Sequence, residues 1–233
     1  MNIKYTLIFL FMIIAIPIKA ETALEFDLFQ KGCDSGNAEG CANLGNSYVQ
    51  KEDYSKAFDL YQKACNGGSA LGCDGLGTLY LLGRGGVKED HSKATVLFQK
   101  ACNGWNTLDG IKVANVLGCK MLGSLYLRGK KYSKAVEVYS VVCESGDYEG
   151  CNTLGELYDN GDGVKKDYFK SAELFQKACE GGDSEGCNNL GFAYGKGQGV
   201  RQNTQKAFEL FGLSCDMQNQ VGCDNYAKLK TGS

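Results

Sequence analysis

Twelve cysteines recur along this 233-residue chain at spacings that only a repeated structure explains. Taken in order they form six pairs, and five of the six pairs have seven residues between their two cysteines. From Cys41 onward, each pair's second cysteine follows the previous one by 32, 46, 32, 36 and 36 residues, which leaves no segment outside the pattern. A period near 36 residues is typical of solenoids built from helix pairs. The six pairs are Cys33 with Cys41, Cys65 with Cys73, Cys102 with Cys119, Cys143 with Cys151, Cys179 with Cys187, and Cys215 with Cys223.

Each unit carries the same two motifs between its cysteines. The first is L-G-x-x-Y, as in Leu44-Gly45 and Tyr48, whose Leu and Tyr lie on one face of a helix. We expect its glycine to let a neighbouring backbone approach. The second motif is K-A-x-x-L-[YF]-x-K-A-C with small variations, and its apolar spacing predicts an amphipathic helix. The residues expected to cap these second helices are Asp53, Asp90, Asp167 and Asn203.

The chain opens with a lone second helix at residues 23–33 and closes with a lone first helix at 223–229, and both are suited to cap a stack. We therefore predict an all-α solenoid of eleven or twelve helices without a convincing strand. The one irregular spacing contains the single tryptophan, Trp105, which we expect to pack against Ile111 or Val113.

The first twenty residues read as a signal peptide. Lys4 is followed by an apolar stretch from Tyr5 to Ile16, and Ala20 supplies a small residue before a cut at Glu21. The stretch is too short for a stable membrane span. We expect a single solenoid domain over 21–233, secreted or periplasmic.

An oxidising compartment favours paired cysteines. Two pairings repeat with the structure: each C-x₇-C pair closes on itself, or each second cysteine bonds forward to the next unit's first. The forward scheme leaves Cys33 and Cys223 unpaired at opposite ends, so we favour local closure. Each nine-residue closure contributes about 2–3 kcal/mol in the chain-entropy model. We expect no metal, because zinc sites use closer cysteines and usually histidines, and the chain has one histidine.

These motifs resemble the Sel-one-like repeat, a relative of the tetratricopeptide repeat, and the C-x₇-C pairs resemble its disulfide-rich branch, the Helicobacter cysteine-rich proteins. The resemblance covers residues 23–229. It implies a right-handed superhelix of tetratricopeptide-like (TPR-like) helix pairs, whose concave groove is lined by the first helix of each pair. It also implies secretion or a periplasmic location, penicillin binding and, in some members, weak β-lactamase activity.

The residues themselves offer no catalytic motif. No serine has a lysine three positions later, as serine β-lactamases require, and no G-x-S-x-G elbow occurs. His91 lies beside Asp90 and Ser92, but adjacent helical residues point in different directions, so we interpret it as a solvated helix-start residue. No cofactor is expected, and whether the protein is an enzyme stays open.

A binding groove is better supported. If the helices pack as in TPR proteins, the positions one and two before the motif Leu, and two after it, face the concave side. These columns also include Asp74, Thr78 and Thr153, and asparagine amides in them suit peptide backbones or sugars. Surface helix positions are commonly polar in any case. The candidate ligand-binding residues are Asn43, Asn46, Lys120, Ser124, Asn152, Glu156, Asn188 and Asn189.

The leading functional interpretation is a binding module for a protein, a peptide or a peptidoglycan fragment. The alternatives are a penicillin-binding protein that slowly hydrolyses β-lactams, and a structural envelope protein. The formal net charge of −2, which becomes −4 once Lys4 and Lys19 leave with the signal, offers no basic face for nucleic acid. We expect a monomer.

Overall fold

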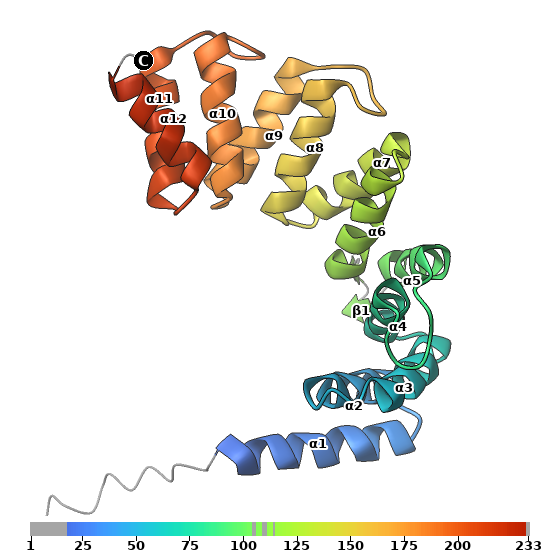
Figure 1. The fold of residues 1–233 in the computed structure, drawn as a ribbon. Helices are drawn as coiled ribbons and strands as arrows, with labels where there is room; N and C mark the ends of the chain where they lie inside the picture. Colours follow the sequence, from blue (N-terminus) through green and yellow to red (C-terminus); the bar gives the residue numbers. More distant parts are fainter. Residues whose placement is uncertain (1–17, 104–105, 109–110, 114, 232–233) are drawn as a thin grey trace, which may run out of the picture.

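The structure is a computed structural model that describes residues 18–103, 106–108, 111–113 and 115–231, and it is an arch of stacked helix pairs (Figure 1). The described residues form twelve helices and two short strands, β1 (Asn106–Leu108) and β2 (Ile111–Val113). None of the helices in these ranges is long and apolar enough to cross a membrane. The helices are α1 (Ile18–Asp34), α2 (Ala38–Gln50), α3 (Tyr54–Asn66), α4 (Ala70–Leu82), α5 (His91–Asn103), α6 (Val116–Arg128), α7 (Tyr132–Glu144), α8 (Tyr148–Asn160), α9 (Tyr168–Glu180), α10 (Ser184–Lys196), α11 (Thr204–Asp216) and α12 (Gln220–Thr231).

The helices form the predicted right-handed solenoid of TPR-like pairs. Each helix packs against the next one along the chain, so α1 lies at one end of the arch and α12 at the other (Figure 1). First helices also contact one another across units, as in α2 with α4 and α8 with α10, whereas successive second helices pack less closely. Since the inner side of a curved stack is the crowded side, the first helices line the concave surface.

A hairpin inside the longest cysteine spacing contradicts the expectation that the chain has no strand. Strands β1 and β2 pair antiparallel, with Asn106 opposite Val113 and Leu108 opposite Ile111. The sequence holds a reason: an Asp109-Gly110 dipeptide, which is frequent in hairpin turns, is followed by the alternating apolar and polar residues Ile111, Lys112 and Val113. The segment is too short to stand out against the helical repeat. Trp105 and its predicted packing lie outside the described residues, as does most of the predicted signal peptide.

All six cysteine pairs close locally, which confirms the local scheme. Each disulfide joins the end of one second helix to the next first helix, with Cα atoms 4.3–4.5 Å apart. The bonds join Cys33 to Cys41, Cys65 to Cys73, Cys102 to Cys119, Cys143 to Cys151, Cys179 to Cys187, and Cys215 to Cys223. The pair with the longest spacing, Cys102 with Cys119, therefore closes in the same way as the five C-x₇-C pairs, across the loop that holds the hairpin.

The glycine before each second cysteine permits the close approach of the two helices. A Cβ added to Gly40 would lie 3.0 Å from the Cys33 nitrogen, and one added to Gly186 would lie 3.1 Å from that of Cys179. A larger residue at either position would push the two cysteine backbones apart.

The glycine of the L-G motif has a different neighbour from the one expected. It faces an aromatic ring of the same unit's second helix, not a backbone: a Cβ on Gly45 would lie 2.7 Å from the Tyr61 ring, and one on Gly155 the same distance from Phe175. The motif Leu and the ring are both buried, as Leu44 and Tyr61 illustrate. The aromatic ring of the [YF] residue in the second motif therefore packs against the Leu and Gly of the L-G pair.

The four predicted caps of second helices are confirmed. Side-chain oxygens of Asp53, Asp90, Asp167 and Asn203 accept hydrogen bonds from backbone N–H groups in the first turn. The first helices carry a second set of caps that the sequence motifs do not predict, each four residues before a second cysteine and each accepting from the glycine N–H that precedes that cysteine. They are Asn37, Ser69, Asn115, Asp147, Asp183 and Asn219.

Candidate functional site on the concave surface

The eight candidate residues all lie on first helices, but the structure separates them into three groups. Asn43 and Asn46 are on α2, Lys120 and Ser124 on α6, and the other four, Asn152, Glu156, Asn188 and Asn189, on α8 and α10. Only the last group brings several predicted residues within hydrogen-bond distance of one another.

In that group, side-chain amides connect one repeat to the next. Asn189 of α10 donates to Asn152 Oδ1 of α8 over 3.0 Å. One repeat further on, Asn225 of α12 donates in the same way to Asn188 Oδ1 over 2.9 Å. We call these two bonds the amide ladder. Asn225 was missed in the sequence because Tyr226 replaces the motif Leu in the last unit and obscures the alignment.

The amide ladder changes the interpretation of the asparagine columns. Asn152 and Asn188 were expected to face solvent, but they are buried, with 3% and 5% of their surface exposed. Their burial between neighbouring first helices, together with the bonds they accept, gives them a structural role. The partly exposed members of the group, Asn189 and Glu156, are the ones that a ligand can reach.

Glu156 is a partly buried carboxylate on this surface. Its Oε1 accepts from Asn189 over 3.2 Å and from Asn152 over 3.4 Å, while its Oε2 has no hydrogen bond with the described residues. Burial, reinforced by the charge of Glu185, raises the pKa of the Glu156 carboxyl above its usual value. Burial likewise raises the pKa of Asp183. Glu156 forms no ion pair within the described ranges, so its negative charge is uncompensated.

A pocket opens beside Glu156 between α8 and α10. Its volume is about 160 Å³, and its lining includes Asn189, Phe192 and Lys196 besides the carboxylate. Phe192 is partly exposed and packs edge-to-face on Phe211, with ring centroids 5.1 Å apart. Asp159, Asn160, Phe175, Ala193 and Gln198 complete the lining, so acidic, amide and aromatic groups share the pocket with the basic Lys196, and its volume suits a single side chain of a bound partner.

The middle group is engaged in contacts within the protein. Lys120 Nζ lies 3.2 Å from Asp147 Oδ2 and 2.5 Å from Glu149 Oε2, so it ties α6 to the start of α8. Burial lowers the pKa of Lys120, but the bonds to Glu149 and Asp147 outweigh it and raise the pKa overall. Ser124 Oγ lies 3.2 Å from the hydroxyl of Tyr139. These ion pairs bridge α6 and α8, two first helices that pack less closely against each other than α2 does against α4 or α8 against α10.

The first group lines another hollow, of about 520 Å³, between α1 and α2. Asn43 and Asn46 face it together with Phe26, Phe29 and Lys51. Asn46 Oδ1 accepts a hydrogen bond from the Tyr61 hydroxyl over 2.5 Å, while the side chain of Asn43 has no hydrogen bond with the described residues. Of these two asparagines, only Asn43 therefore has both its amide oxygen and its amide nitrogen free of hydrogen bonds with the described residues.

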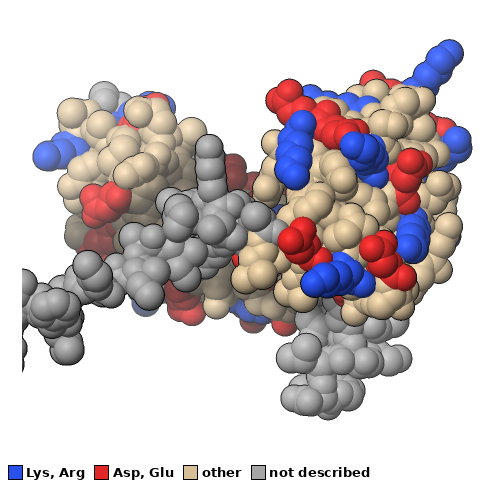
Figure 2. All heavy atoms as spheres, turned by 90° about the horizontal axis from the view of Figure 1, so that it is seen from below, with Lys and Arg blue, Asp and Glu red and all other residues tan. Residues whose placement is uncertain are grey.

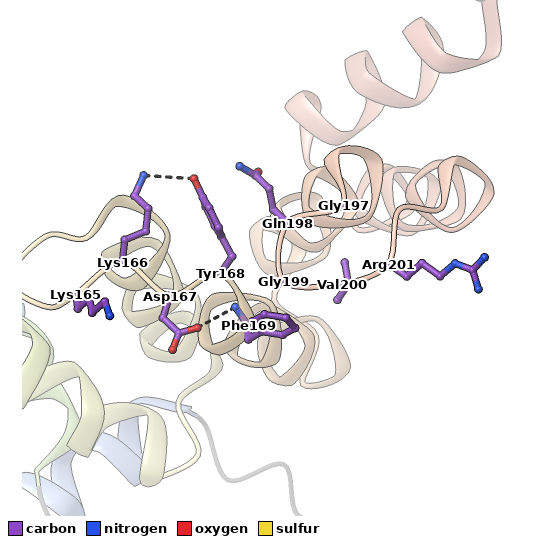
Figure 3. Close-up of a pocket in the computed structure, with 10 residues that line it drawn as sticks. All are labelled: Lys165, Lys166, Asp167, Tyr168, Phe169, Gly197, Gln198, Gly199, Val200 and Arg201. Atoms are coloured by element: carbon purple, nitrogen blue, oxygen red, sulfur yellow. Dashed lines mark hydrogen bonds between the residues drawn. The ribbon is translucent and has the colours of Figure 1, made fainter.

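A further hollow of about 710 Å³ lies on the loop edge, where loops 161–167 and 197–203 face each other (Figure 3). Lys166 Nζ reaches the Tyr168 hydroxyl at 3.4 Å, and Gln198 stands across the gap from it (Figure 3). The hollow needs two long loops in succession, and only the two 36-residue units supply them. It lies outside the predicted columns.

His91 lies where the sequence places it, at the start of α5 and exposed. Its Nε2 is 2.6 Å from Glu89 Oε1, in a surface pair. Across the described ranges, no group of three or more His, Cys, Asp or Glu side chains could hold a metal ion. On the face shown in Figure 2, basic and acidic side chains are interspersed, without a patch of one sign.

A comparison with protein-family models identifies the type of repeat. The model of the Sel1 repeat matches residues 38–69, 70–104, 149–183 and 184–219, which is more than half of the chain. The chain belongs to the Sel1 repeat family. Residues 105–148, which the model leaves unmatched, contain the hairpin and one further Sel1-like helix pair, α6 and α7.

Solved structures agree with this fold. A Sel1 repeat protein from Oxalobacter formigenes is 24% identical over 88% of this chain and 84% of its own, with a TM-score of 0.71. Helicobacter pylori cysteine rich protein B is 32% identical over 58% of this chain and 94% of its own, with a TM-score of 0.45. YrrB, a TPR protein described as having an unusual peptide-binding site, is 20% identical over 86% and 97%, with a TM-score of 0.55. No curated protein matches the chain.

Proposed function

We propose that this protein is an exported interaction module that holds an extended peptide along α8, α10 and α12, with a cationic side chain of the peptide at Glu156. The observation that carries the proposal is the state of Glu156: a half-buried carboxylate at the wall of a pocket, with one oxygen unbonded and no cation paired to it among the described residues. An incoming ammonium or guanidinium group would supply both the missing charge and the missing donor.

Neighbouring groups fit a peptide backbone. Asn189 donates two hydrogen bonds through Nδ2, to Asn152 and to Glu156, which leaves its Oδ1 free to accept from a backbone N–H. Phe192 offers an apolar face beside it. Repeat proteins of this architecture present extended concave surfaces to partners, and YrrB is one structurally similar protein whose description names a peptide-binding site. Six disulfides further support a location outside the cytoplasm.

The test is a fluorescence anisotropy titration with an extended-peptide library whose central residue is Lys, Arg, Ala or Glu. We expect Lys and Arg peptides to bind best, and Glu156→Gln to weaken them about tenfold, because the substitution keeps the shape and removes the charge. Glu173→Gln, an exposed acid on α9, is the matched control and should bind as the parent does. Equal binding of all four peptides, or an unaffected Glu156→Gln variant, contradicts the proposal.

Peptidoglycan fragments and penicillin enter the same titration as separate arms, because the resemblance to the cysteine-rich branch implies them. A fragment that binds through its peptide stem should compete with the Lys peptide. Penicillin binding that is insensitive to Glu156→Gln would place that ligand elsewhere on the protein. If no arm binds, the structural envelope interpretation replaces the module.

A further inference from the structure

The hollow on the loop edge, between loops 161–167 and 197–203, has the composition of a second binding site. Its lining has three basic side chains, Lys165, Lys166 and Arg201, and one acidic side chain, Asp167. Asp167 Oδ1 already serves as the cap of α9, where it accepts from two backbone N–H groups. The hollow therefore carries an excess of positive charge, in a chain whose formal net charge is −2.

The three cations have no acidic partner in the part of the chain that the structure describes. The side chains of Lys165 and Arg201 form no hydrogen bond or ion pair with these residues, and Lys166 contacts the hydroxyl and the ring of Tyr168. In the view of Figure 3, Lys165 and Lys166 lie on one side of the hollow and Arg201 on the other. A ligand in the hollow thus meets uncompensated positive charge on both sides.

The repeat explains why cations flank this hollow. Lys165 and Arg201 each follow the valine of a G-x-G-V loop, so they occupy the same position in two successive long loops. Lys88 occupies this position in the remaining long loop. The equivalent loops on either side of it, 51–53 and 129–131, have three residues each, so Lys88 has no long loop opposite it.

The corresponding place beside α3 is closed by a contact within the protein. There, Arg84 Nη1 donates to the Tyr54 hydroxyl over 2.6 Å, and the guanidinium lies 4.7 Å from the centroid of the same ring. Gln198 and Tyr168 occupy the same two positions in the later units, but no hydrogen bond joins them, and Figure 3 shows them on opposite sides of a gap. The space that a loop-to-helix contact fills beside α3 is therefore open beside α9.

Phe169, at the floor of this gap in Figure 3, is an aromatic residue at a position that is otherwise polar. It precedes the Lys of the K-A pair, where the other units have Ser55, Ser92, Ser133 and Gln205. Phe169 is 74% exposed, so the packing of the solenoid does not require its ring. Aromatic residues and arginine are enriched at the centres of protein interfaces. Phe169 therefore supplies an apolar contact between the two groups of cations.

We propose that this hollow binds an acidic polypeptide segment of a partner, in which two carboxylates flank an apolar side chain. One carboxylate pairs with Lys165 and Lys166, the other pairs with Arg201, and the apolar side chain packs on Phe169. The charge of the lining selects an acidic ligand. The hollow has a volume of about 710 Å³, and such a concavity suits a segment that enters it better than a flat membrane surface.

Fluorescence anisotropy with labelled peptides and the purified, oxidised protein tests the proposal. Three Gly/Ser-rich peptides carry Glu-Phe-Glu, Glu-Ser-Glu or Lys-Phe-Lys at their centres. The parent should bind the Glu-Phe-Glu peptide about tenfold more tightly than either of the others, and its affinity should fall with added salt. Equal affinities for the Phe and Ser peptides, or no binding of the Glu-Phe-Glu peptide, overturn the proposal.

Three substitutions locate the binding. Lys165→Glu and Arg201→Glu should each weaken the Glu-Phe-Glu peptide about tenfold, and Phe169→Ser should reduce its affinity to that of the Glu-Ser-Glu peptide. These side chains are exposed, so the melting temperatures should match that of the parent. Lys88→Glu is the matched control, at the same loop position but without a facing long loop, and should bind as the parent does. A loss in Lys88→Glu equal to that in Lys165→Glu would indicate an effect of net charge alone and overturn the proposal.

A further variant separates this site from the Glu156 pocket, which adjoins it because Gln198 lines both. Glu156→Gln should leave the affinity for the Glu-Phe-Glu peptide within about twofold of the parent, because the hollow acts through other side chains. A larger loss in this variant overturns the proposal. Phosphatidylglycerol vesicles form the last arm of the experiment: binding of the vesicles without binding of the peptide would assign the cations and Phe169 to a membrane surface and overturn the proposal as well.

Discussion

Asp74 shows how much one residue depends on the next repeat. It stands in the column of Asn152 and Asn188, but the residue one repeat further along is Met121, which has no hydrogen to donate. Asp74 is buried and its Oδ1 has no hydrogen-bond partner among the described residues. Burial raises the pKa of its carboxyl to about 6. Burial, with the charge of Asp74, also raises the pKa of Tyr61 to about 12.

Asp74 should therefore make stability depend on pH. Its folded pKa of about 6 lies above the unfolded value of 3.8, so the folded state binds the proton more tightly, and stability should fall as pH rises from about 4 to about 6. Asp74→Asn should remove this component and stabilise the protein by about 3 kcal/mol at pH 7, since each unit of pKa shift corresponds to about 1.4 kcal/mol. Urea unfolding between pH 4 and pH 8 measures it. Asp224→Asn, in the same column but exposed on α12, should leave the profile unchanged; a shared profile for all three proteins would contradict the assignment.

Residues whose environment lies within their own helix could be predicted from the sequence. The four second-helix caps depend on a backbone N–H two or three residues away, and all four were correct. The burial of Asn152 could not be predicted, because its partner Asn189 lies 37 residues along the chain. Whether a residue in the asparagine columns is exposed depends on the contact between two neighbouring repeats. The sequence of a single repeat therefore does not determine it.

At the scale of helices, the amide ladder holds α8, α10 and α12 in register, and no equivalent bonds join α2 to α4 within the described residues. The inner helices are thus connected differently in the two halves of the arch. Ion pairs of Lys120 connect α6 to α8 between them. The repeat spacing predicted every helix pair, but not which side chains would join one pair to another.

Asn189→Ala should destabilise the protein by about 1–3 kcal/mol, because the buried Asn152 Oδ1 loses its donor. Asn43→Ala is the matched control: it occupies the same column on α2 and forms no side-chain hydrogen bond with the described residues, so it should change stability by less than about 0.5 kcal/mol. Chemical denaturation of the two variants and the parent measures the difference. Equal losses would mean that the ladder adds nothing to stability.

Across the whole molecule, the six disulfides replace the large core that an arch one helix pair thick does not have. Buried residues form several separate clusters along the stack, each shared by neighbouring helices. The cysteine spacing carried most of the fold prediction for this reason: it marks every boundary between units. The hairpin was not predicted because it is an insertion at one boundary between units and does not recur at the others.

Reduction should therefore weaken the entire stack. We expect no free thiol in the denatured, unreduced protein and twelve after reduction, since all six pairs are closed. The melting temperature should fall sharply on reduction, because each opened closure returns about 2–3 kcal/mol of chain entropy to the unfolded state. Thiol titration and calorimetry provide the measurements. A melting temperature that reduction leaves unchanged would show that packing alone holds the helices together.

The placement of the disulfides also decides how the molecule responds to being pulled from its ends. Every bridge crosses a turn between units, so the boundaries between units are covalently clamped, whereas the loops that join the two helices of one unit are not. Tension along the chain would bypass the clamped turns and separate first from second helices inside each unit. Such a solenoid should extend in steps that each correspond to the separation of one helix pair. The disulfides limit the length gained in each step, because the turns that they close cannot extend.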